Sequence, residues 1–189
     1  MRHMAPEARD QFSVAFICTG NRFRSPLAAA FLARAEEDVP LRIVSLGTLE
    51  LGPVPALPEA IEVAERHGLD LGSHVARTIR DVDLEPFDLV LGFERAHIAT
   101  AVVDAGARET HTFMLAELVS LLDQAPLSVD GAAPAERARA RIAQATRLRA
   151  FPAADFELPD PLGRPARAQR KIAARLETLV RELAAKLFA

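Results

Sequence analysis

One feature near the N-terminus restricts the possible folds most. It is an apolar run followed, after one short polar loop, by a helix-forming segment. Phe12–Cys18 is mostly apolar and is bounded by polar residues, as is typical of a buried parallel strand. After the loop, Ser25 and Pro26 are residue types that favour a helix start, and the alanine-rich segment Leu27–Glu36 follows. The pattern predicts a strand, a tight loop and a buried helix.

Strand and helix signals alternate along the rest of the chain. We expect strands at Leu41–Thr48 and Phe87–Phe93, a weaker one at Glu109–Met114, and helices at Pro58–His67, Arg95–Asp104 and Arg167–Phe188. Such alternation with short connections predicts an α/β fold with a doubly wound sheet and right-handed crossovers. Sheets of this kind bind ligands at the carboxyl ends of their strands, which is where Cys18 lies.

Length and composition favour one compact domain, because 189 residues with 50% apolar content can bury a single core. We expect a flexible N-terminal segment at 1–11 and a single domain at 12–189, with a helical insertion around 124–150. Within that insertion, Gln124–Pro134 is rich in turn residues and Glu136–Arg149 is an arginine-rich helix. Its arginines are predicted to form a solvated face, with a docking surface for an acidic partner as the alternative.

The overall charge of the chain does not favour nonspecific binding of nucleic acid. The formal net charge is −3, and Lys171 and Lys186 are the only lysines. The first ten residues contain no apolar signal region, and no uncharged apolar run is long enough to span a membrane. We therefore expect a cytoplasmic protein that binds neither nucleic acid nor membranes.

The loop after the first strand has the composition of an oxyanion-binding loop. The strand ends at Cys18 and the helix begins near Arg24, so the backbone between them must curl, and curled N–H groups beside a helix N-terminus hold a tetrahedral oxyanion. Gly20 and Asn21 tolerate the left-handed backbone that such a curl requires. The expected binding residues are Thr19, Gly20, Asn21, Arg22 and Phe23.

Cys18 is the only cysteine, which excludes an internal disulfide and a multi-cysteine zinc site. A lone cysteine is usually a small buried apolar residue, but here the helix dipole and Arg24 favour the thiolate, which is a nucleophile. The guanidinium of Arg24 can bind two oxygens of the same anion. Ser25 is expected to cap the helix, to hydrogen-bond the Cys18 sulfur, or both.

A reaction at this loop needs an acid for the leaving group, and Asp160 is the candidate. It lies between two prolines in Glu157–Gly163, which keeps it on a stiff loop outside any helix. An ordinary turn aspartate is the alternative.

Taken together, Cys-x5-Arg-Ser-Pro at 18–26, Ser-Leu-Gly-Thr at 45–48 and Asp-Pro at 160–161 resemble the low-molecular-weight protein tyrosine phosphatase family. The resemblance implies a four-stranded parallel sheet flanked by helices, and phosphomonoester hydrolysis without metal or cofactor through a phosphocysteine. It implies that Cys18 attacks phosphorus, that Asp160 serves as acid and then as base, and that His74 supports Asn21. The substrate would be a phosphorylated protein or a small phosphomonoester.

Some residues depart from the pattern of that family. Phe23 replaces the second cysteine that protects the nucleophile in many members, so oxidised Cys18 would need an external thiol. Arg22 is a cation at a specificity position and should disfavour phosphoarginine and favour additional negative charge on the substrate. The chain has no tyrosine or tryptophan, so the usual aromatic wall is absent. The candidates to line that space are Leu49, Leu51, Phe93 and Leu162.

Two other functions fit the same loop. Arsenate resembles phosphate, and related proteins reduce it through a cysteine adduct. In this chain the reduction would require an external low-molecular-weight thiol or a thiol protein, with an inorganic oxyanion as the substrate. A phosphate-binding interaction module with little turnover is the third possibility, although an intact nucleophile, arginine and acid argue against it.

Overall fold

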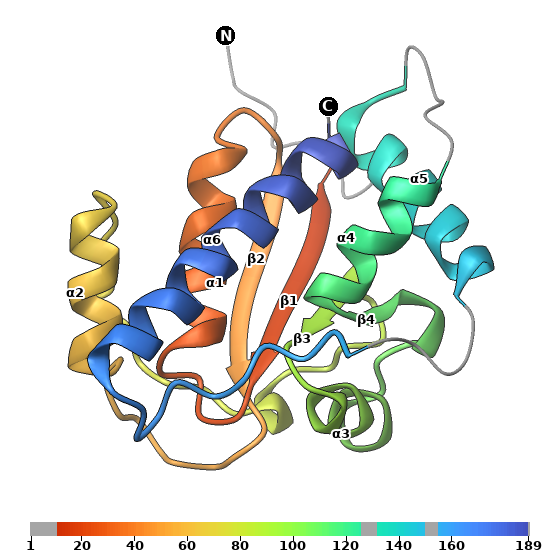
Figure 1. Ribbon diagram of the computed structural model, residues 1–189. Coiled ribbons are helices and arrows are strands. Elements are labelled where there is room, and N and C mark those ends of the chain that lie inside the picture. The colour runs from red at the N-terminus through yellow and green to blue at the C-terminus, as the bar shows by residue number, and fades with distance from the viewer. Residues whose placement is uncertain (1–10, 126–131, 150–154, 189) are drawn as a thin grey trace, which may run out of the picture.

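A computed structural model describes residues 11–125, 132–149 and 155–188, and it places a four-stranded parallel sheet at the centre of the molecule (Figure 1). The strand order is β2-β1-β3-β4. The strands are β1 (Phe12–Cys18), β2 (Leu41–Gly47), β3 (Leu89–Gly92) and β4 (Thr112–Met114). This confirms the predicted α/β fold class.

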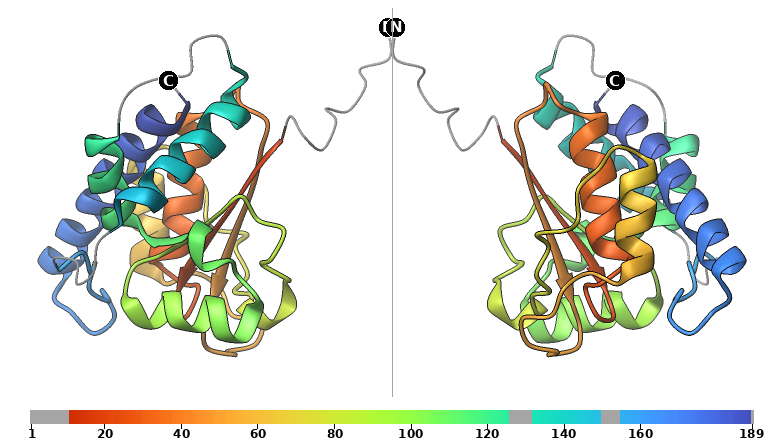
Figure 2. Two further views of the ribbon diagram at one scale, coloured as in Figure 1. Left: turned by 90° about the vertical axis from the view of Figure 1, so that its right-hand side faces the viewer. Right: turned by 90° about the vertical axis from the view of Figure 1, so that its left-hand side faces the viewer.

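Helices cover both faces of the sheet (Figure 2). They are α1 (Arg24–Ala35), α2 (Pro58–Arg66), α3 (Arg95–Ala105), α4 (Leu115–Gln124), α5 (Pro134–Leu148) and α6 (Ala166–Phe188), with short 3-10 turns at Ile79–Asp81 and Glu109–His111. On one face, α1, α2, α4, α5 and α6 share one apolar core with the sheet. On the other face, α3 and the 3-10 turn at Ile79–Asp81 pack in a smaller core.

The alternation of side chains along β1 explains why both faces are covered. Phe12, Val14 and Phe16 belong to the larger core, whereas Ala15 and Ile17 belong to the smaller one. Because both sets are apolar, β1 is stable only with a layer on each side, which is the arrangement of buried parallel sheets.

The element boundaries differ from the predictions in a few places. The predicted strand Glu109–Met114 splits into a 3-10 turn and the short β4, whereas α1 begins at Arg24 as expected. Helix α4 was not predicted, because its apolar run follows β4 without a turn residue between them. Part of the turn-rich segment Gln124–Pro134 lies outside the described residues.

The arginines of α5 do not form the predicted solvated face. Arg139 pairs with Asp88 at 2.8 Å, and Arg137 donates to the Phe188 carbonyl. Arg141 is buried and donates to carbonyl oxygens of α4, α6 and Ala125. A guanidinium has five donors, so it can bind several carbonyl oxygens at helix ends that would otherwise be unpaired. The predicted helix Glu136–Arg149 contains five arginines, and four of them attach α5 and its C-cap to the domain: Arg137, Arg139, Arg141 and Arg149.

Among the helices in the described part of the chain, none is long and apolar enough to cross a bilayer.

Candidate active site

The loop from Cys18 to Arg24 connects β1 to α1 at the carboxyl edge of the sheet. The loop packs closely on the end of β2, where a Cβ on Gly47 would lie 3.0 Å from backbone atoms of the loop. Glycine at 47 therefore allows this approach, and any side chain would displace the loop. The predicted strand, loop and helix are all present.

The Cys18 sulfur is buried at the floor of the loop and accepts two hydrogen bonds when it is a thiolate. The backbone N–H of Asn21 donates to Sγ at 3.2 Å, and Ser25 Oγ lies 3.0 Å from it. The Ser25 hydroxyl has a single proton and a second acceptor, the Leu46 carbonyl, at 3.3 Å. A thiolate is the stronger acceptor, so it draws the proton to sulfur.

Of the two roles expected for Ser25, the structure shows contact with the sulfur and no capping. The helix begins one residue earlier, and its N-cap residue, Phe23, makes no side-chain cap bond. Ser25 lies within the first turn of α1, which brings its hydroxyl beneath the loop.

Asn21 holds the loop in its curled form. It has a φ of 53°, in the left-handed region, whereas Gly20, the other residue that tolerates such a backbone, is not in that region. The Asn21 amide donates to Ser25 and Ser45, both at 2.9 Å, and accepts from the Arg77 N–H at 2.9 Å. Its side chain thus ties α1, β2 and the segment before the first 3-10 turn to one point.

His74, to which the resemblance gives a supporting role, contacts the loop at Asn21. Its Nε2 lies 2.7 Å from the backbone carbonyl oxygen of Asn21. The contact is made to the backbone of Asn21 and leaves the side-chain amide free for its three other bonds.

Arg24 is almost fully buried behind the loop and is oriented by four oxygen atoms. Its Nη1 donates to the Leu158 carbonyl at 3.0 Å and lies 3.2 Å from Glu94 Oε2. Its Nη2 donates to Thr19 Oγ1 at 3.1 Å and to Asp160 Oδ2 at 2.6 Å. The buried charge is therefore paired, as a guanidinium in this position requires.

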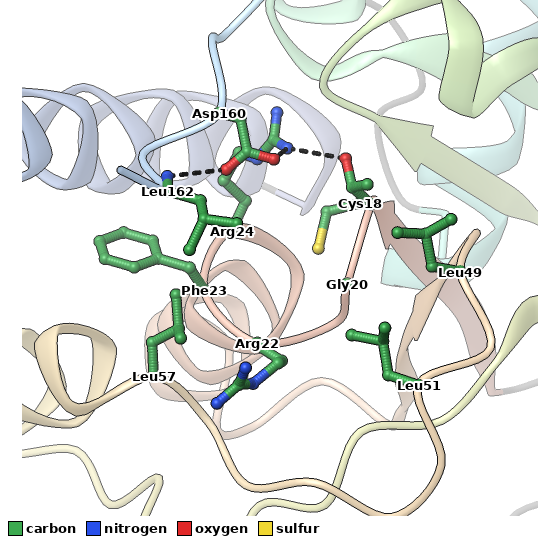
Figure 3. Close-up of a pocket in the computed structure, with 11 residues that line it drawn as sticks. Cys18, Gly20, Arg22, Phe23, Arg24, Leu49, Leu51, Leu57, Asp160 and Leu162 are labelled. Atoms are coloured by element: carbon green, nitrogen blue, oxygen red, sulfur yellow. Dashed lines mark hydrogen bonds and ion pairs between the residues drawn. The ribbon is translucent and has the colours of Figure 1, made fainter. Parts of the chain in front are cut away.

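Asp160 reaches the loop from a segment far along the chain (Figure 3). Besides the bond to Arg24, its Oδ1 accepts from the Leu162 N–H at 2.9 Å, which forms a short turn. Asp160 lines the pocket above Cys18, and its side chain remains 39% exposed. Asp160 therefore makes the contact of a turn aspartate and also brings a carboxyl group to the pocket, where an acid for the leaving group would have to lie.

Two neighbours of Arg24, Glu94 and His97, were not among the predicted site residues. His97 is buried, and its Nδ1 accepts from the backbone N–H groups of Phe93 and Glu94 at 3.2 and 3.1 Å. Its Nε2 lies 3.1 Å from Thr19 Oγ1. Burial and the adjacent Arg24 charge lower the pKa of His97 to about 4, so the ring is neutral near pH 7.

The pocket above the sulfur has a volume of about 250 Å³ and mostly apolar walls. Figure 3 shows the Cys18 sulfur pointing into it, with Leu49 and Leu51 on one side and Phe23, Leu57 and Leu162 on the other. The expectation that Phe93 lines this space is wrong, because Phe93 is buried and packs beneath Arg24, 5.8 Å from ring centroid to guanidinium carbon.

Arg22 supplies the charge at the edge of this pocket. Its Nε donates to the Pro55 carbonyl at 2.8 Å, which fixes the side chain along the wall. Within residues 11–125, 132–149 and 155–188, no carboxylate pairs with Arg22. The same residues contain no cluster of three or more potential metal ligands.

Comparison with known proteins identifies relatives that are similar in sequence to part of this chain. A family model described as low molecular weight phosphotyrosine protein phosphatase matches residues 13–145. The "Probable low molecular weight protein-tyrosine-phosphatase EpsP" of Ralstonia solanacearum is 35% identical over 79 residues, covering 42% of this chain and 53% of that protein. The "Low molecular weight protein-tyrosine-phosphatase Etp" of Escherichia coli K12 is 34% identical over 87 residues, covering 46% and 57%. The chain thus spans about half the length of these curated relatives.

Solved structures extend the likeness over most of the chain. A low molecular weight protein tyrosine phosphatase from T. tengcongensis has a TM-score of 0.70 at 25% identity, covering 93% of this chain and 99% of that one. The fold also matches the YwlE arginine phosphatase from Geobacillus stearothermophilus, with a TM-score of 0.68 at 24% identity and coverage of 93% and 92%. With the matched sequence and this fold around Cys18, the chain belongs to the low molecular weight phosphotyrosine protein phosphatase family.

Proposed function

We propose that the chain hydrolyses phosphomonoesters through a phosphocysteine, with phosphotyrosine in proteins as the leading substrate class. The observation that carries the proposal is the convergence of Cys18, Arg24 and Asp160 on one pocket, with Ser25 beneath the sulfur. A nucleophile, an oxyanion-binding cation and an acid are the three groups that the reaction needs.

In the first step the Cys18 thiolate attacks phosphorus, and the bond from phosphorus to the ester oxygen breaks. Protonated Asp160 gives its proton to that oxygen, so the leaving group departs as a neutral alcohol or phenol. A bound phosphoryl group competes with Asp160 for the N–H groups of Arg24, which frees the carboxyl group to face the leaving oxygen.

In the second step water attacks the phosphocysteine and Asp160 accepts a proton from it. The bond from phosphorus to sulfur breaks, and the thiolate is restored with inorganic phosphate as the product. Hydrogen bonds from Ser25 and the Asn21 N–H stabilise the departing sulfur.

The walls of the pocket support an aryl phosphate over phosphoarginine. The exposed leucines Leu49, Leu51 and Leu162 offer apolar contact to a ring. A phosphoarginine leaving group carries its own cation, which Arg22 would repel.

Hydrolysis of p-nitrophenyl phosphate, phosphotyrosine peptide and phosphoarginine peptide tests the proposal. We expect turnover of the first two, poor turnover of the third, and complete loss with Cys18→Ser. Asp160→Asn should lower kcat by about 10²- to 10⁴-fold, the usual contribution of a general acid. Turnover that is unchanged in Cys18→Ser would refute the mechanism.

A further inference from the structure

We infer that His97 is a positioning residue that turns the Thr19 hydroxyl into a hydrogen-bond donor for an oxygen of the bound phosphoryl group. The inference rests on the proposed function and concerns a pair of residues behind the loop. Thr19 lines the pocket, whereas His97 is buried and does not.

The hydrogen bonds of His97 settle which of its ring nitrogens holds the proton. Two backbone N–H groups, those of Phe93 and Glu94, point at Nδ1 from 3.2 and 3.1 Å. A nitrogen that accepts two donors has no proton of its own, and a neutral imidazole then has its proton on Nε2. The start of α3 thus fixes the tautomer.

Thr19 Oγ1 therefore faces two donors. Nε2 of His97 lies 3.1 Å from it, and Nη2 of Arg24 donates to it at the same distance. Glu94 Oε2 also lies 3.3 Å from Nε2, and a carboxylate oxygen can only accept a proton there, which is consistent with a donor at Nε2. In the described part of the chain, these are the only hydrogen-bond partners of Thr19 Oγ1, and neither can accept the hydroxyl proton.

A hydroxyl whose lone pairs are both engaged has one direction left for its proton. Because Thr19 lines the pocket beside Cys18, that direction is toward the ligand. A hydrogen bond to a charged oxygen is about twice as strong as a neutral one. If the His97 tautomer were reversed, Nε2 would accept the threonine proton and the donor would be lost.

A double-mutant cycle tests the coupling through a measurement that needs no turnover. Calorimetry gives the Kd of inorganic phosphate for the wild-type chain, Thr19→Val, His97→Leu and the double variant. We expect each single change to weaken binding by about tenfold, the effect of one hydrogen bond to a charged group. In the Thr19→Val background, His97→Leu should add less than about twofold.

Other variants separate positioning from damage to the fold. His97→Gln keeps an N–H donor and should recover most of the affinity, and so should Thr19→Ser, which keeps the hydroxyl. Thr112→Val removes a buried hydroxyl that donates to the Arg108 carbonyl outside the site, so it should leave the Kd unchanged. Equal losses in His97→Gln and His97→Leu, or additive losses in the cycle, would overturn the inference.

Nitrogen-15 NMR of the histidine rings supplies an independent readout. We expect the His97 ring to hold its proton on Nε2 from about pH 6 to 8. A proton on Nδ1 would contradict the inference. If phosphate binding follows the expected cycle but no ester is hydrolysed, the proposed function fails while the role of His97 stands.

Discussion

Asn21 offers a prediction that separates backbone strain from hydrogen bonding at one position. Its side chain is fully buried and makes three hydrogen bonds, while its backbone is left-handed. Asn21→Ala removes the bonds and places a Cβ in a strained conformation. Asn21→Gly removes the same bonds without that strain.

The two changes differ by an amount that the structure defines. Three lost hydrogen bonds at about 1 kcal/mol each cost about 3 kcal/mol in both variants. Alanine in the left-handed region costs about 1–2 kcal/mol more. Glycine avoids this cost but loses more entropy on folding, so we expect Asn21→Gly to be more stable than Asn21→Ala by about 1 kcal/mol. The alanine variant would thus lose a large part of the usual 5–15 kcal/mol, about 4–5 kcal/mol in all.

Urea denaturation followed by circular dichroism measures the free energy of unfolding of each variant, and it suits a chain without tryptophan or tyrosine. Ser45→Ala is the matched control, because it removes one of the three bonds and should cost about 1 kcal/mol. An alanine variant as stable as the glycine variant would refute the strain argument. A loss below about 1 kcal/mol in both would refute the hydrogen-bond network.

Three further predictions concern charged groups. For Arg22 the measurement is the ratio of kcat/KM between two phosphotyrosine peptides, one with a neighbouring glutamate and one with glutamine in its place. Arg22→Gln should lower this preference for the glutamate peptide by about 2- to 5-fold. Arg66→Gln, which lies outside the pocket, should leave the preference unchanged. Arg141→Met should destabilise the fold by about 3 kcal/mol in thermal or urea denaturation, because buried carbonyl groups lose their donor; a loss under about 1 kcal/mol would contradict this. The pKa of His97 is about 4 in the folded chain and about 6.5 in the unfolded chain, so below pH 6.5 the unfolded chain takes up a proton that the folded chain does not. The free energy of unfolding should therefore be highest above about pH 6.5 and should fall by about 3 kcal/mol toward pH 4. In His97→Gln the loss of unfolding free energy between pH 7 and pH 4.5 should be smaller; an identical loss would refute this origin.

Local patterns predicted the centre of the fold and half of the site. The first strand, its loop and the helix after it are contiguous, so the alternation of residue types within about 25 positions was enough to place Cys18 and Arg24. Asp160 is more than 130 residues from the loop, and the sequence suggested it only through stiff prolines and the family resemblance. Its contact with Arg24 depends on how the segment before α6 crosses the sheet edge.

The missed features depend on tertiary contacts that spacing does not reveal. His97 follows the end of β3 by five residues and lies in the first turn of α3, at the same sheet edge as Cys18. This position was the one signal that could have indicated it. The arginines of α5 look like a charged surface because one chain segment alone does not show that carbonyl oxygens of α4 and α6 will face them. The role of 124–150 as an insertion stays a prediction.

The contacts of Arg24 with Leu158 and Asp160 determine when, during its synthesis and folding, the chain acquires a complete active site. They join residues separated by 134 and 136 positions. During synthesis, N-terminal segments fold first, so a nascent polypeptide that extends only to α5 has Cys18 and Arg24 but lacks Asp160, the proposed acid. Under the proposed mechanism, full turnover begins only after the segment that contains Asp160 docks, so the rate reports whether that segment has folded onto the loop.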